Sequence, residues 1–177
     1  SQHANDFNII SEQTEDEIAA INMAIGAWYA GGRAMVTTSG GGLALMGEGI
    51  SLAGIVESPM VIHLAQRPGP STGLPTYSAQ GDLRFAIHAS QGEFPRVAVA
   101  PGDVEECFYA TLEAFNLAEK FQIPALIIMD KYLSESYGTS KILDQNSIGI
   151  DRGQLITEDT YTGEEYKRHQ LTETGIS

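Results

Sequence analysis

Apolar residues along this chain fall into short β-type runs separated by longer stretches with the spacing of helices. The runs that predict strands are, in chain order, Val36 to Ser39, Pro59 to Ala65, Arg96 to Ala100 and Pro124 to Met129. The stretches that predict helices start at Ile18, at the glycines after Ser39, at Asp82 and at Val104. Strands that alternate with helices are typical of an α/β domain. The pattern therefore predicts a mostly parallel sheet with helices on both faces.

Three consecutive glycines, Gly40, Gly41 and Gly42, directly follow the first predicted strand. Helical spacing resumes after them and continues to Val56, which predicts one helix there. Glycines at such a turn allow the backbone to approach another group closely. The free N–H groups of the helix start favour a polar or anionic ligand. Ligands of parallel α/β sheets bind at the carboxyl ends of the strands, where this turn is expected.

Composition narrows the class of protein. Hydrophobic residues make up 42% of the 177 positions and are too dispersed for a membrane span. The net charge of −13 argues against a nucleic-acid partner. The single cysteine, Cys107, excludes an internal disulfide and a four-thiolate cluster held by this chain alone. Since no signal segment opens the chain, a cytoplasmic protein is expected.

The chain divides into two regions by composition. Residues 1–133 alternate apolar strands and helices and predict one α/β domain. Residues 134–177 lack apolar runs and are rich in Asp, Glu, Thr, Gly and Tyr. Such a segment is too polar to form a core of its own. We expect an acidic, irregular extension that wraps the domain or leads towards a further one.

Glu17 is the first residue with candidate chemistry. It ends the pattern Thr14-Glu15-Asp16-Glu17, which opens the first helix and matches a capping box. In that role its carboxylate returns to the Thr14 backbone and needs no ligand. From these residues alone, Glu17 is either a helix-capping residue or a ligand-binding carboxylate.

Arg67 is the second candidate, because it directly follows a predicted strand and opens a loop rich in proline and glycine that runs to Thr76. Long structured loops at that edge of a sheet are usually functional. A guanidinium there could bind a carboxylate through two hydrogen bonds, although a surface charge is the alternative. Ser71, Thr72 and Thr76 add hydroxyl groups to the same loop. His63 lies within a strand and is expected to be a hydrogen-bonded core residue.

Several of these segments together resemble a known family. Glu15 to Ala27 followed by Val36 to Gly42 is similar to the pyrimidine-binding domain of thiamine-diphosphate enzymes. The loop Arg67 to Thr76, with Gln80-Gly81-Asp82-Leu83 after it, narrows the resemblance. The combination resembles the alpha subunit of 2-oxoacid:ferredoxin oxidoreductases of the 2-oxoglutarate type.

The resemblance implies a role for each candidate. Glu17 would be the catalytic glutamate that hydrogen-bonds the aminopyrimidine of thiamine diphosphate and promotes its imino tautomer. Ser39, Gly40, Gly41 and Gly42 would bind the cofactor beside that ring. Arg67 would bind the carboxylate of the substrate. The implied reaction is the oxidative decarboxylation of a 2-oxo acid, with 2-oxoglutarate favoured, to acyl-CoA and CO2 with reduction of ferredoxin.

The sequence also departs from the family. It has no Gly-Asp-Gly motif for diphosphate and Mg²⁺, so a beta subunit is expected to hold both. Iron–sulfur clusters are expected on another subunit or on ferredoxin. The Tyr-Pro-x-Thr-Pro loop usual before the glutamate does not occur in this sequence, either because the segment is missing from this chain or because the member is divergent. Two alternatives are another thiamine-diphosphate enzyme of the decarboxylase or acetolactate-synthase type, and a non-catalytic interaction domain of the same fold.

Overall fold

The four strands form one parallel sheet in the computed structural model, which describes residues 4–177. The strands are β1 (Met35–Ser39), β2 (Met60–Gln66), β3 (Val97–Val99) and β4 (Pro124–Asp130). Their order in the sheet is β1-β2-β4-β3, and every pair is parallel. The predicted α/β class and its parallel sheet are confirmed. The first three residues of the predicted domain lie outside the described part.

Helices connect the strands. They are α1 (Glu17–Tyr29), α2 (Gly40–Leu45), α3 (Gly47–Ile55), α4 (Leu83–His88), α5 (Val104–Phe121) and the short α6 (Lys131–Glu135), with a 3-10 turn, η1 (Asn5–Phe7), before them. The expected single helix from the glycines to Val56 is wrong, because the chain breaks at Met46 into α2 and α3. Among residues 4–177 no helix is long and apolar enough to cross a membrane.

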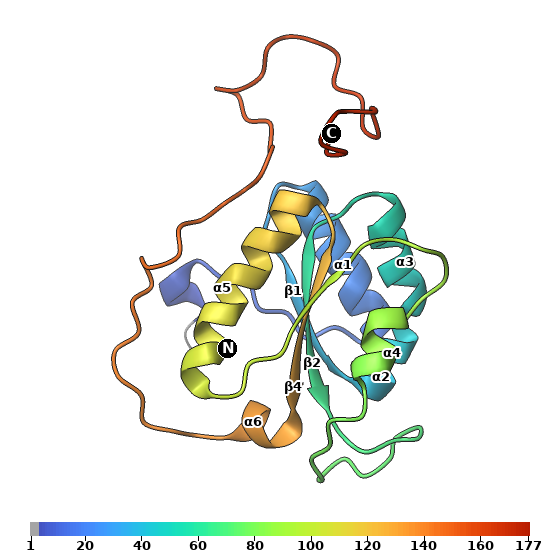
Figure 1. Ribbon diagram of the computed structural model, residues 1–177, viewed down its shortest axis with the longest axis vertical. Helices are drawn as coiled ribbons and strands as arrows, with labels where there is room; N and C mark the ends of the chain where they lie inside the picture. The colour runs from blue at the N-terminus through green and yellow to red at the C-terminus, as the bar shows by residue number, and fades with distance from the viewer. Residues whose placement is uncertain (1–3) are drawn as a thin grey trace.

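The helices cover both faces of the sheet (Figure 1). Alternate strand residues such as Ile62 and Leu126 pack with α1 to α4, whereas Val61 and Ile127 pack under α5. The chain moves across the sheet in one direction from β1 to β3 and then returns to β4. Parallel crossovers are right-handed, so this reversal places α5 on the face opposite α2 to α4. Two apolar cores result, one on each side of the sheet.

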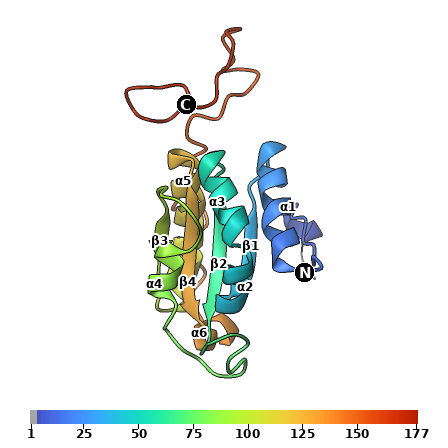
Figure 2. The same ribbon diagram turned by 90° about the vertical axis from the view of Figure 1, so that its right-hand side faces the viewer.

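The strand register brings the glycine turn and the proline-rich loop together. Ser39, the last residue of β1, is paired with Ala65 in β2. Each strand then ends within one residue, so Gly40 and Arg67 leave the sheet at neighbouring points. Figure 2 shows the strands side by side, with the loop after β2 beyond their carboxyl ends. A candidate site at this edge is therefore built by the parallel pairing of β1 and β2.

The extension after α6 contains no further helix or strand, and it follows α5 (Figure 1). Its contacts run along that helix from Lys141 paired with Glu105 to Arg152 paired with Glu119. The Glu119 carboxylate is only 7% exposed and also pairs with Arg33 at 2.9 Å. Farther on, Arg168 donates to the backbone of Glu57 at 2.5 Å. The extension is thus tied to both ends of α5 and, through Arg168, to the segment just before β2.

Candidate functional site

A cavity of about 510 Å³ lies where the glycine turn, the start of α1 and the loop after β2 meet. The candidate residues from the sequence all line it, namely Glu17, Ser39, Gly40, Gly41, Gly42 and Arg67. Residues 68–72, Asp82 and the apolar Ala44 and Leu45 of α2 complete the wall. The fold thus gathers residues from three separate parts of the chain at one place.

Glu17 is the first residue of α1, and Asp16 is the residue that caps the helix. The Asp16 carboxylate accepts a hydrogen bond from the Ala19 backbone N–H at 2.7 Å. Thr14 donates its hydroxyl to the Asp16 carbonyl oxygen at 2.9 Å. The expected capping box between Thr14 and Glu17 is therefore wrong. Within the described part of the chain, no hydrogen bond or ion pair engages the Glu17 carboxylate.

Gly42 is the residue that allows Glu17 to lie against the turn. A Cβ atom added to Gly42 would be 2.7 Å from Glu17 Oε1 and 2.8 Å from Glu17 Cγ. It would also overlap Thr38 Oγ1. Such separations are shorter than van der Waals contact, so any other residue at position 42 would displace one of these side chains. The glycine is required here by the Thr38 hydroxyl as well as by the Glu17 carboxylate.

The loop that carries Arg67 is fixed by hydrogen bonds at its start and at its end, where the chain approaches α4. Leu74 donates its backbone N–H to the Pro68 carbonyl at 3.1 Å. Gly73 at φ +63° makes this closure possible, since a Cβ there would overlap the Pro68 carbonyl. At the return, Gln80 donates to the Asp130 carboxylate at 2.8 Å. A loop held at both ends presents its side chains from a defined backbone.

The guanidinium of Arg67 has no hydrogen bond or ion pair within residues 4–177. It lines the cavity together with Ser71 and Thr72. Thr76, the third hydroxyl considered from the sequence, is not part of the wall. Arg67 is half-buried and lines the cavity.

Asp82 is a wall residue that the sequence arguments did not select. Its backbone N–H donates to Gln66 Oε1 at 2.8 Å, and its Oδ2 is buried without a hydrogen-bond partner. Burial raises the pKa of the Asp82 carboxyl. From the sequence, Asp82 is the predicted start of a helix and part of the segment Gln80-Gly81-Asp82-Leu83, and neither position indicates a site residue. The sequence signal that could have found it is its place at the return of the Arg67 loop.

His63 and Cys107 lie outside the cavity. His63 differs from its prediction, and Cys107 is not part of a candidate site. His63 was expected to be hydrogen-bonded, but its Nε2 is buried without a partner, and burial lowers its pKa. Cys107 places its Sγ 3.2 Å from Met129 Sδ, and burial raises the pKa of its thiol. Within residues 4–177, no group of three His, Cys, Asp or Glu side chains is placed to hold a metal ion.

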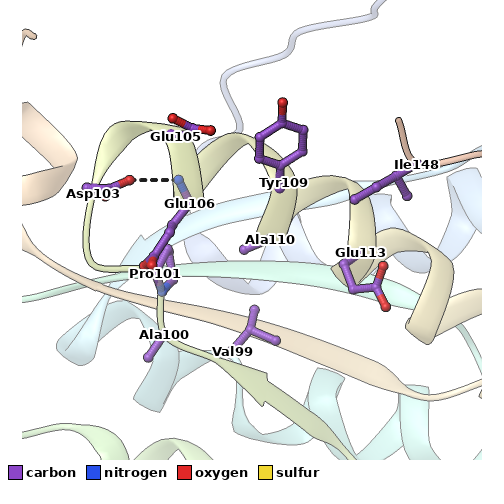
Figure 3. A pocket seen from close by; sticks show the side chains of 10 residues that line it. All are labelled: Val99, Ala100, Pro101, Asp103, Glu105, Glu106, Tyr109, Ala110, Glu113 and Ile148. Atoms are coloured by element: carbon purple, nitrogen blue, oxygen red, sulfur yellow. Dashed lines mark hydrogen bonds between the residues drawn. The ribbon is translucent and has the colours of Figure 1, made fainter. Parts of the chain in front are cut away.

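A second hollow, of about 700 Å³, lies at the start of α5 (Figure 3). Its carboxylates are largely engaged within the protein. Asp103 accepts from the Glu106 backbone N–H at 2.8 Å, Glu106 accepts from the Gly102 N–H at 2.7 Å, and Glu105 pairs with Lys141. Glu113 lacks a partner within the described residues, but only the glycine-turn cavity brings together side chains of both charges without partners, namely Glu17, Arg67 and Asp82. The glycine-turn cavity is therefore the candidate site.

A parallel α/β fold with an unpaired glutamate, a glycine turn and a free arginine at its carboxyl edge fits the thiamine-diphosphate-binding class. Comparison with known families agrees. Residues 1–170 match the family described as "Pyruvate flavodoxin/ferredoxin oxidoreductase, thiamine diP-bdg". The chain belongs to this family.

Individual relatives carry related names. The chain is 47% identical over 171 residues to the 2-oxoacid:ferredoxin oxidoreductase 1 alpha subunit of Sulfurisphaera tokodaii, covering 96% of this chain and 27% of that protein. It is 48% identical over 125 residues to the 2-oxoglutarate synthase subunit KorA of Archaeoglobus fulgidus, covering 71% and 36%.

One solved structure closely matches the fold. It is 2-oxoglutarate:ferredoxin oxidoreductase from Magnetococcus marinus with 2-oxoglutarate, coenzyme A and succinyl-CoA bound. The TM-score is 0.91 at 40% identity, over 99% of this chain and 30% of that one. The resemblance to oxidoreductase alpha subunits is confirmed, and nothing supports the acetolactate-synthase-like alternative. The chain spans about a quarter of the length of the first of these relatives.

Proposed function

We propose that this chain is the pyrimidine-binding portion of the alpha subunit of a 2-oxoacid:ferredoxin oxidoreductase. The assembled enzyme would oxidatively decarboxylate a 2-oxo acid, with 2-oxoglutarate favoured, to acyl-CoA and CO2 while reducing ferredoxin. The family and the names of the relatives support this proposal. The 2-oxoglutarate and coenzyme A named in the Magnetococcus marinus structure support the choice of substrates.

The observation that carries the proposal is the set of charged side chains without partners in one cavity. Glu17, Arg67 and Asp82 line the same wall, yet none of their side chains forms a hydrogen bond or ion pair within the described residues. Half-buried charges are normally paired, because burial removes their hydration. Unpaired charges of both signs around a glycine turn are expected where a polar ligand supplies the missing partners.

The residues present fit thiamine diphosphate. The Glu17 carboxylate is held against Gly42 and is free to share a proton with a ring nitrogen. The glycine turn leaves one face of the cavity without side chains, as a flat ring requires. When bound, thiamine diphosphate would supply the carbon nucleophile for the 2-oxo carbonyl and accept the electrons released on decarboxylation.

Arg67 would bind the carboxylate of the oxo acid. A guanidinium matches a carboxylate with two parallel hydrogen bonds and remains charged at every physiological pH. Its backbone is fixed by the loop closure at Pro68 and Leu74. The oxo acid would therefore bind in one orientation relative to Glu17, which lines the same cavity.

The remaining components belong to other parts of the assembly. The proposal places the diphosphate and Mg²⁺ on a beta subunit, and the iron–sulfur clusters on another subunit or on ferredoxin. Residues 134–177 would lead from the pyrimidine-binding domain, residues 1–133, towards a further domain. The enzyme would act in the cytoplasm. A partner subunit is then required for tight cofactor binding.

Calorimetric titration tests this proposal. The full-length subunit assembled with its beta subunit should bind thiamine diphosphate in the presence of Mg²⁺ and reduce ferredoxin with a 2-oxo acid and CoA. The alpha subunit alone should bind the cofactor only weakly. Submicromolar binding by the alpha subunit alone would contradict the division of the site between two chains. Absence of binding by the assembly would contradict the proposed function itself.

A further inference from the structure

Asp82 occupies a helix-capping position but does not cap. It directly precedes α4, yet its side chain accepts no hydrogen bond from that helix. Three other aspartates precede helices in the described chain and do cap, namely Asp16, Asp103 and Asp130. Their backbone is extended, with φ −151° and ψ 177° at Asp16, whereas Asp82 has φ −93° and ψ −1°. The backbone of Asp82 thus directs its carboxyl group elsewhere.

That carboxyl group lies on Gly40, at the start of the glycine turn. A Cβ atom added to Gly40 would be 2.5 Å from Asp82 Oδ2 and 3.2 Å from Oδ1. Asp82 and Glu17 therefore contact different glycines of one turn, Asp82 at Gly40 and Glu17 at Gly42. The turn lies between two carboxyl groups, and both line the cavity.

The buried position of the Asp82 carboxyl group is unfavourable in free energy for the ligand-free protein. Asp82 Oδ2 is buried and has no hydrogen-bond partner, so ionisation of the carboxyl is penalised. The pKa of Asp82 is raised by burial, in agreement with this penalty. A cap would have provided the carboxyl with a backbone N–H partner, as it does at the other three aspartates. Such a penalty is expected at binding sites, where the ligand supplies the partner.

We infer that Asp82 is a ligand-binding residue of this cavity, whose carboxyl group accepts a hydrogen bond from an N–H donor of the bound molecule. Gly40 lies against the carboxyl group, and Asp82 lines the cavity, so a bound molecule there could supply the hydrogen bond that the carboxyl group lacks within the protein. The inference rests on the proposed function for the identity of that molecule. A 2-oxo acid anion carries only acceptors, whereas an aminopyrimidine carries amino N–H donors. Asp82 would therefore bind the aminopyrimidine, on the other side of the turn from Glu17.

The test compares Asp82→Ala and Asp82→Asn with the unmodified enzyme, each assembled from full-length subunits. The affinity for thiamine diphosphate, measured by calorimetry, should fall about ten- to a hundredfold in Asp82→Ala. Asp82→Asn keeps an acceptor oxygen and should recover part of the loss. The melting temperature of both ligand-free variants should be equal to or above that of the unmodified enzyme, because the buried carboxyl is gone.

Asp103→Ala is the matched control, since this aspartate caps α5 and does not line the candidate cavity. It should lower the melting temperature and leave cofactor affinity unchanged. Unchanged cofactor affinity in Asp82→Ala, or a lower melting temperature alone, would overturn the inference. Higher KM for CoA with unchanged cofactor affinity would overturn the assignment to the pyrimidine and point to the amide groups of CoA. If the unmodified assembly binds no thiamine diphosphate, the proposed function has failed rather than the role of Asp82.

Discussion

Replacement of Gly42 by alanine tests whether the glycine turn exists to admit Glu17. The new Cβ would lie 2.7 Å from Glu17 Oε1 and would overlap Thr38 Oγ1. The overlap with Thr38 Oγ1 requires that this hydroxyl rotates or that the turn shifts, and the flexible Glu17 side chain is expected to move as well. Gly42→Ala should therefore swing the carboxylate away from the turn without unfolding the domain.

The expected loss of stability and the expected loss of turnover in Gly42→Ala can be measured separately. Added volume in a packed site typically costs about 1–3 kcal/mol of stability. A displaced general acid–base group typically lowers turnover about 10²–10⁴-fold. The variant enzyme, assembled with its partner, should show that loss in 2-oxo-acid-dependent reduction of ferredoxin. Its denaturant-induced unfolding should shift by no more than the packing cost.

Gly26→Ala is the control for this experiment. Gly26 is an exposed residue of α1, and an added Cβ would meet no atom within 4 Å. Alanine is preferred over glycine inside a helix by roughly 0.5–1 kcal/mol, so this variant should be slightly more stable and fully active. Wild-type turnover in Gly42→Ala would refute the argument that the turn accommodates Glu17. A stability loss as large as the activity loss would also count against it.

Three further predictions concern single side chains. Glu17→Gln should leave the melting temperature unchanged, because Asp16 caps α1. The same variant should lower turnover about 10²–10⁴-fold. A near-normal kcat would exclude the catalytic role of Glu17. Arg67→Ala should raise KM for the oxo acid roughly ten- to a hundredfold, and Arg67→Lys should recover part of that loss. An unchanged KM together with a lower melting temperature would show that Arg67 has a structural role instead. Glu119→Ala removes the ion-pair partner of Arg33 and Arg152, which keep hydrogen bonds to Asn116 and Gly31. It should cost about 1.5–3 kcal/mol in denaturant unfolding and expose residues 141–177 to limited proteolysis. Resistance equal to that of the unmodified protein would show that this carboxylate does not hold the extension.

Local sequence determined most of the elements. The apolar runs near Pro59 and Pro124 became β2 and β4, and α5 begins at Val104, where the pattern predicts a helix. These features depend on side-chain periodicity and on contacts within a few residues, so they can be read along the chain. The break at Met46 could not, since helical spacing continues through it.

The candidate site was predictable only in part. Glu17, the glycine turn and Arg67 were selected from the sequence because of their places at helix and strand ends and the family resemblance. Their assembly in one cavity depends on the parallel pairing of β1 with β2 and on α1 lying beside α2. The capping box at Thr14 was a plausible local pattern, and Asp16 took that role instead.

Tertiary structure alone decided the position of Asp82 and the reason for the glycines. From the local sequence, Asp82 is the start of a helix, and the Gly40 to Gly42 run is a turn in which the backbone approaches an unidentified group closely. In the folded chain two carboxyl groups from distant segments press on that turn, and a side chain at Gly40 or Gly42 would collide with them. Sequence patterns report the preferences of neighbouring residues, whereas this constraint is steric and arises between groups that meet only after the sheet has formed.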